Sequence, residues 1–126
     1  MINYFEDETR PLDVYERELL PIMVKSLQRH VGRRQAVTNR AMQSGLAESG
    51  YDISDARIRK LISHIRINGL VECLMATSKG YYVTTDVKEL EDYVESLRGR
   101  VKAIEAVVNA MQDQLENLRH KKTEGK

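Results

Sequence analysis

The stretch that decides the fold is ISDARIRKLISHIRINGL, residues 53–70. Its isoleucine and leucine residues recur at spacings of three and four, which predicts an amphipathic helix over 55–68. Ser54, directly before it, is a typical N-cap residue. At about 100° per residue, Arg59 and Lys60 fall opposite the apolar stripe. The stretch therefore predicts a helix with a basic exposed face, and the buried face is formed by Ile58, Leu61, Ile62 and Ile65.

Two helices are predicted upstream of this one. Apolar residues at spacings of three and four over 14–31 indicate a helix, in which Pro21 either introduces a kink or begins a second helix. Thr38 is a typical N-cap residue for a helix over about 39–49. The stretch 35–37 between them has extended character. The predicted order is therefore helix, short extended segment, helix, tight turn, helix.

A β-hairpin is predicted after the glycine that ends the 55–68 helix. Strand-like residues at 70–76 and 81–84 flank Thr77-Ser78-Lys79-Gly80, a typical turn sequence. Cys73 lies in the first strand pattern, where we expect a small buried side chain. The hairpin would carry Lys79 at its tip.

The C-terminal third carries a heptad repeat, preceded by Asp86, which with Glu89 forms a variant of a capping box. Valine at most a positions and leucine-like residues at d favour a parallel two-stranded coil. Val107 and nearby alanines widen the stripe, which raises the chance of an antiparallel coil or a tetramer. The alternative is a helix that folds back on its own chain. The predicted oligomerisation residues are Val87, Leu90, Val94, Leu97, Val101, Ile104, Val108, Met111, Leu115 and Leu118.

Composition limits the class of protein. The chain has 126 residues, 41% of them hydrophobic and 31% charged, enough for a core in one small domain with an appendage. No apolar run approaches the length of a membrane span, and the N-terminus lacks the pattern of a signal peptide. A single cysteine, Cys73, excludes an internal disulfide. We therefore expect a cytoplasmic protein without a membrane partner.

Charge is distributed unevenly, although the net charge is only +1. Residues 30–82 carry eight basic and four acidic side chains, a net charge of +4. Residues 1–29 carry four basic and six acidic side chains, and residues 83–126 eight basic and nine acidic, which gives −2 and −1. A basic region of this kind is the expected footprint of phosphate binding.

The order of these elements resembles a winged helix-turn-helix domain. The resemblance covers residues 14–85 and rests on the 38–50 helix, the 54–69 helix with its IRINGL ending, and the 76–83 hairpin. The phrase TSKGYYV and the long helix after it are similar to small phage and prophage winged-helix proteins. The resemblance implies a mainly α (α+β) fold, with a small β-hairpin wing and a long C-terminal coiled-coil helix. The remaining divisions are an acidic segment at 1–13, the coil at 86–118 and a flexible basic tail at 119–126.

In that family the third helix usually enters the major groove of double-stranded DNA. Arginine there can pair with guanine, while serine and lysine mostly contact phosphates. The helix before it would offer its N-terminus to the backbone, and the hairpin tip would reach a phosphate or the minor groove. The DNA-binding residues that the resemblance implies are Thr38, Asn39, Arg40, Ser54, Arg57, Arg59, Lys60, Ser63, His64 and Lys79.

The residues contain no catalytic arrangement, and the histidines lack metal-ligand spacing relative to each other or to Cys73. We therefore expect no enzyme activity, metal or cofactor. The hypothesis is a DNA-binding protein that associates with itself, as a dimer or tetramer, in transcription regulation or phage-type replication control. The alternative is an adaptor whose winged helix and coil both bind proteins, which the near-neutral net charge and the acidic N-terminus leave open. Salt-dependent binding to duplex DNA separates the two.

Overall fold

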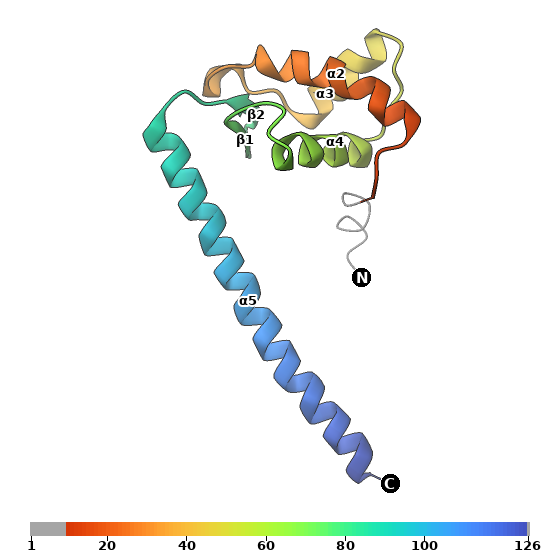
Figure 1. Ribbon diagram of the computed structural model, residues 1–126, viewed down its shortest axis with the longest axis vertical. Helices are drawn as coiled ribbons and strands as arrows, with labels where there is room; N and C mark the ends of the chain where they lie inside the picture. Colours follow the sequence, from red (N-terminus) through yellow and green to blue (C-terminus); the bar gives the residue numbers. More distant parts are fainter. Residues whose placement is uncertain (1–9, 126) are drawn as a thin grey trace. The chain divides into compact units, whose positions relative to one another are not determined.

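The computed structural model describes residues 10–125, and this part of the chain divides after Val87 into two compact units. Most of the described chain is helical, with one two-stranded antiparallel sheet. This confirms the mainly α class, the small hairpin and the long C-terminal helix (Figure 1). No helix within residues 10–125 combines the length and the apolar content needed to cross a membrane.

Three helices build the N-terminal unit: α2 (Val14–Gln28), α3 (Asn39–Glu48) and α4 (Asp55–Ile67). The N-caps predicted for α3 and α4 are confirmed, because the side chains of Thr38 and Ser54 accept hydrogen bonds from backbone amides in the first turn of each helix. Pro21 lies inside a single helix, α2. That helix begins with a capping box between Asp13 and Glu16, which was not predicted from the sequence.

The core of this unit lies where the apolar faces of the three helices meet. Leu19, Met23 and Leu27 of α2 are fully buried, as are Ile58, Leu61 and Ile65 of α4. Met42 and Leu46 of α3 and Leu74 of the hairpin also belong to the cluster. The predicted apolar stripe of α4 is therefore confirmed as its core face.

The hairpin consists of β1 (Leu74–Thr77) and β2 (Gly80–Val83), in a register that pairs Leu74 with Val83 and Thr77 with Gly80. Two isolated bridges extend the sheet: Val37 pairs with Tyr81, and Val31 pairs with Val83. The extended character predicted for residues 35–37 is confirmed at Val37 by the first of these bridges, but it is wrong for Gln35, which lies in a 3-10 helix. A short 3-10 helix, η1 (Arg33–Gln35), lies between the two bridging valines.

The expectation of a buried Cys73 is wrong. The chain still turns at this residue, which has a φ of +59°, and the first strand begins only at Leu74. The thiol side chain is exposed. The sequence reading placed the start of the strand four residues too early, because Leu70 and Val71 continue an apolar run without belonging to the strand.

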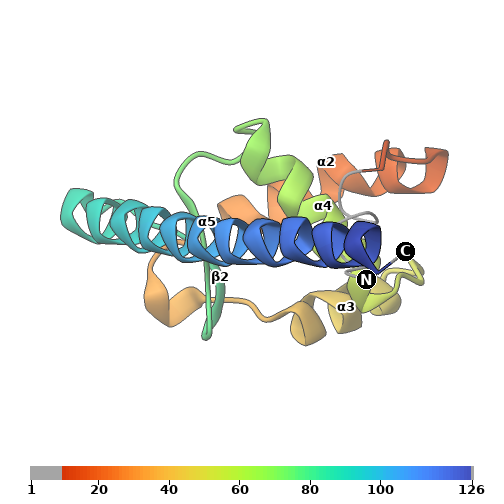
Figure 2. The same cartoon turned by 90° about the horizontal axis from the view of Figure 1, so that it is seen from below.

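The second unit is one helix, α5 (Val87–Glu124), of 38 residues (Figure 2). It extends past the predicted end at 118, so residues 119–124 are helical instead of a flexible tail. Residues 119–124 contain neither Gly nor Pro, and His120 Nε2 lies 2.9 Å from Glu124 Oε1 one turn later. None of its residues is buried. We call the ten predicted oligomerisation residues on this helix the α5 seam.

Candidate nucleic-acid interface

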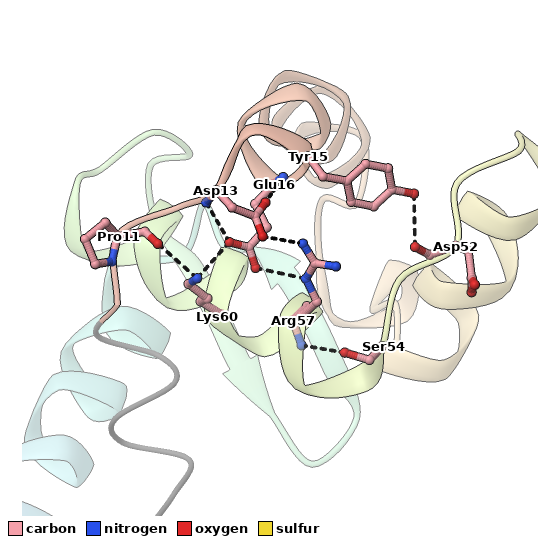
Figure 3. Close-up of polar contacts among 8 residues, drawn as sticks. All are labelled: Pro11, Asp13, Tyr15, Glu16, Asp52, Ser54, Arg57 and Lys60. Atoms are coloured by element: carbon pink, nitrogen blue, oxygen red, sulfur yellow. Dashed lines mark hydrogen bonds and ion pairs between the residues drawn. The ribbon is translucent and has the colours of Figure 1, made fainter.

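The cations of α4 do not share one exposed face, because two of them contact α2. Lys60 Nζ lies 2.7 Å from Glu16 Oε1 and donates a second hydrogen bond to the carbonyl of Pro11 at 3.1 Å. Arg57 donates to Glu16 Oε2 at 3.1 Å and to Asp13 at 2.7 Å (Figure 3). Both side chains are therefore engaged in holding the start of α2 against α4.

The prediction that Lys60 lies on the exposed face is wrong, since the residue is only 8% exposed. Its aliphatic stem and ammonium group are covered by the first turn of α2, which extends the buried face of α4 beyond the isoleucine stripe. The acidic partner of this lysine is itself 1% exposed. A buried lysine of this kind is a packing residue, whose charge is offset inside the fold.

Glu16 is the centre of this cluster. Burial raises the pKa of its carboxyl, but hydrogen bonds from Lys60, from the backbone of Asp13 and from Arg57 outweigh burial. The pKa of Glu16 therefore lies below its ordinary value. Burial lowers the pKa of Arg57, but the nearby carboxylates of Glu16 and Asp13 raise it by more. The pKa of Arg57 therefore lies above its ordinary value. The carboxylate of Glu16 and the guanidinium group of Arg57 are thus both charged at neutral pH.

The guanidinium group of Arg57 has a third neighbour. Its central carbon lies 5.3 Å from the centroid of the Tyr15 ring, and the hydroxyl of Tyr15 donates to the carbonyl of Asp52 at 3.0 Å (Figure 3). Arg57 thus lies between the acidic groups of α2 and an aromatic ring. Its predicted place among the DNA-binding residues would require these contacts to be given up.

The side chain of Asn39, at the start of α3, links α3 to α4 and to β2. Its side-chain amide donates to Asp55 at 2.8 Å, and its carbonyl oxygen accepts from the hydroxyl of Tyr81 at 2.6 Å. Asp55 also forms an ion pair with Arg59, one turn along α4. Asn39 therefore fixes the N-terminus of α3 to the N-terminus of α4 and to β2. We call this group the Asn39 junction.

The hairpin lies close to the backbone that directly precedes α3. Gly80 has a φ of +121°, and a Cβ atom at this position would lie 2.5 Å from the carbonyl oxygen of Val37, directly before the N-cap of α3. A larger residue at 80 would thus collide with backbone. The two-residue loop Ser78-Lys79 is therefore held beside the start of α3.

The structure sorts the ten predicted DNA-binding residues into groups. Arg57 and Lys60 contact α2, and Asn39 and Arg59 belong to the Asn39 junction. Thr38 and Ser54 are exposed N-caps, whereas Ser63 and His64 are partly buried on α4. Arg40 and Lys79 are exposed, and within residues 10–125 neither side chain has an ion-pair partner.

Nothing in the described part of the chain groups three or more His, Cys, Asp or Glu side chains in a way that would hold a metal ion. Comparison with protein-family models, with curated proteins and with solved structures found no match. The contacts of the chain itself are therefore the basis for proposing a function, and the resemblance to winged-helix proteins stays a prediction.

Proposed function

We propose that the protein binds double-stranded DNA through its N-terminal unit and associates with itself through the α5 seam. The observation that carries the DNA proposal is the Asn39 junction. It brings the N-termini of two helices together with β2, close to the turn of the hairpin, and the exposed cations Arg40 and Lys79 lie near its residues in the sequence. In this proposal α3 and α4 form a helix-turn-helix, and the β1–β2 hairpin is the wing.

The proposed contact surface consists of the first turns of α3 and α4 and the hairpin tip. Arg40 and Lys79 supply positive charge, while the exposed hydroxyls of Thr38 and Ser54 lie at helix N-termini, where backbone amides favour phosphate oxygens. Arg59 on α4 neutralises Asp55 at the same place. Ser63 and His64 lie further along α4 and are the remaining candidates for contacts to bases.

Arg57 and Lys60 are not part of the proposed surface. Each would have to leave a carboxylate, and Lys60 is buried. Their role in this proposal is to orient α4 on α2, so that the opposite side of the helix is presented to the DNA groove. This moves the proposed positive charge from the middle of α4 to Arg40 at the N-terminus of α3 and to Lys79 in the hairpin.

The test is a fluorescence-anisotropy titration with a random duplex at low and moderate salt. We expect salt-dependent binding that Arg40→Ala with Lys79→Ala weakens, lowering the slope of log K against log salt by about two, one for each phosphate contact. The matched control is Arg17→Ala with Lys25→Ala, which removes two exposed cations from α2.

Two outcomes would contradict the proposal. Absence of binding by the wild-type protein at low salt would favour an adaptor whose partners are proteins. An equal loss of affinity in the α2 control would mean that total charge, and not the surface at the Asn39 junction, governs binding. The proposal places this activity in transcription regulation or phage-type replication control, the two processes that the resemblance implies.

A further inference from the structure

The α5 seam is an apolar surface that lacks a cover within the described chain. Val101 is 54% exposed, Ile104 62% and Val108 57%, in the middle of a helix with no buried residue. Apolar residues repeated along one side of a helix normally mark a binding surface. The question is which helix covers the seam, and in which direction it runs.

Charged residues beside the seam decide the direction, because ion pairs between e and g positions set helix orientation in coiled coils. In a parallel pair each g residue faces the e residue five positions later on the other copy. Arg100 would then face Glu105, which is favourable. Asp86, directly before the first residue of α5, would face Glu91, which is repulsive, and each of these two pairs occurs twice by symmetry. A parallel coil therefore gains little from these side chains.

In an antiparallel pair e residues face e residues, and g residues face g residues. When Val87 lies opposite Leu118 of the second copy, all ten positions of the seam form layers, and Val101 lies opposite Ile104 at the centre. Arg98 then faces Glu105, and Asp86 faces Lys121, each of them twice by symmetry. In this register no e or g residue faces a residue of like charge.

Other antiparallel registers are less favourable. A shift of one heptad in one direction places Glu105 opposite Glu105 of the second copy, and a shift in the other direction places Arg98 opposite Arg98. Either shift also leaves apolar residues at the ends of the seam without a partner. Packing and charge thus select the same alignment.

We propose that the α5 seam is covered by α5 of a second copy of this chain, running antiparallel with Val87 opposite Leu118. This rests on the proposed self-association and adds its direction and register. At 1.5 Å per residue, the two Val87 residues lie about 46 Å apart along the coil. The N-terminal units are therefore attached at opposite ends of the coil.

Spin-label distances test the direction in the full-length protein. Cys73→Ser removes the exposed native thiol, and Lys88→Cys or Lys102→Cys introduces one label site at the same heptad position, b. In the proposed coil, labels at residue 88 are separated by about 44 Å along the axis, whereas labels at residue 102 lie at nearly the same height. A parallel coil gives short distances at both sites, with helix axes about 10 Å apart.

A matched pair of charge reversals gives an independent measurement. Arg98→Glu would place like charges beside Glu105 in the antiparallel coil, whereas Arg100→Glu would face the uncharged Val107. We expect Arg98→Glu to raise the dimer Kd on the order of tenfold, since it converts two attractive pairs into repulsive ones, and Arg100→Glu to change it less. Glu105→Arg in the Arg98→Glu background should restore the Kd.

The outcomes separate this inference from the proposal on which it rests. A short distance at residue 88, or a larger effect of Arg100→Glu, would overturn the antiparallel direction while leaving self-association intact. A wild-type mass of one chain by light scattering would overturn both, and a mass other than two chains would overturn the two-stranded coil. None of these outcomes decides the DNA-binding proposal, which is tested by the DNA titration alone.

Discussion

The N-terminal unit and α5 use apolar residues in opposite ways. In the N-terminal unit, leucines and isoleucines such as Leu61 and Ile65 are fully buried among residues of the same chain. In α5 the apolar residues are as regularly spaced, yet none is buried. Hydrophobic burial is the main favourable contribution to folding, so the first region is stabilised by its own packing, whereas the second would obtain this contribution from the partner proposed above.

The same contrast applies to charge. Lys60 and Arg57 are satisfied inside the N-terminal unit by carboxylates from another helix. The ion pairs of α5, such as Lys88 with Asp92 at 3.0 Å, join residues one turn apart on the helix itself and are exposed. Exposed pairs of this kind contribute little to stability. The N-terminal unit therefore has a tertiary structure stabilised by its own contacts, whereas the apolar seam of α5 is exposed.

The largest expected effect is the loss of the self-association proposed for α5. Val101→Asp with Ile104→Asp places charges in the centre of the α5 seam, and we expect complete loss of the oligomer by light scattering, because burying unpaired carboxylates is strongly unfavourable. Helix content should fall as well, while near-UV circular dichroism of the N-terminal unit is retained. Ala106→Asp with Asn109→Asp, off the seam, is the matched control. Loss of the N-terminal signal would mean that the two regions are not independent.

A smaller effect is expected inside the N-terminal unit. Lys60→Ala removes one partner of the buried carboxylate of Glu16 and leaves Arg57 as the other. We expect the free energy of unfolding, measured with urea, to fall by about 1–3 kcal/mol. Lys25→Ala removes an exposed lysine of α2, and should change it by less than about 0.5 kcal/mol. Equal effects of the two substitutions would show that the buried pair is not important for stability.

The smallest expected effect is a dependence on pH. The pKa of Glu16 is lowered in the folded protein, so its charged form contributes stability above the unfolded pKa of about 4.3, and this contribution is lost as the pH falls through the folded pKa. The difference in unfolding free energy between wild type and Glu16→Gln should therefore be constant near neutral pH and shrink below about pH 4. A difference that stays constant down to pH 3 would contradict this assignment.

Much of the fold could be predicted because it depends on neighbours in sequence. The start of α3 at Asn39 and of α4 at Asp55, the loop at 78–79 and the apolar seam of α5 follow from caps, turn residues and periodicity. The same local rules misplaced the start of β1, because an apolar run does not say where strand pairing begins. They also placed the end of the last helix too early.

The sequence by itself determined where α3 and α4 begin and which face of α4 is apolar. Only the tertiary structure decided which of its cations are exposed. Lys60 and Arg57 find their partners 44 and 41 residues earlier, at Glu16. Helical periodicity describes one helix in isolation, whereas the burial of a cation depends on the neighbouring helix that covers it and on the carboxylate which that helix supplies.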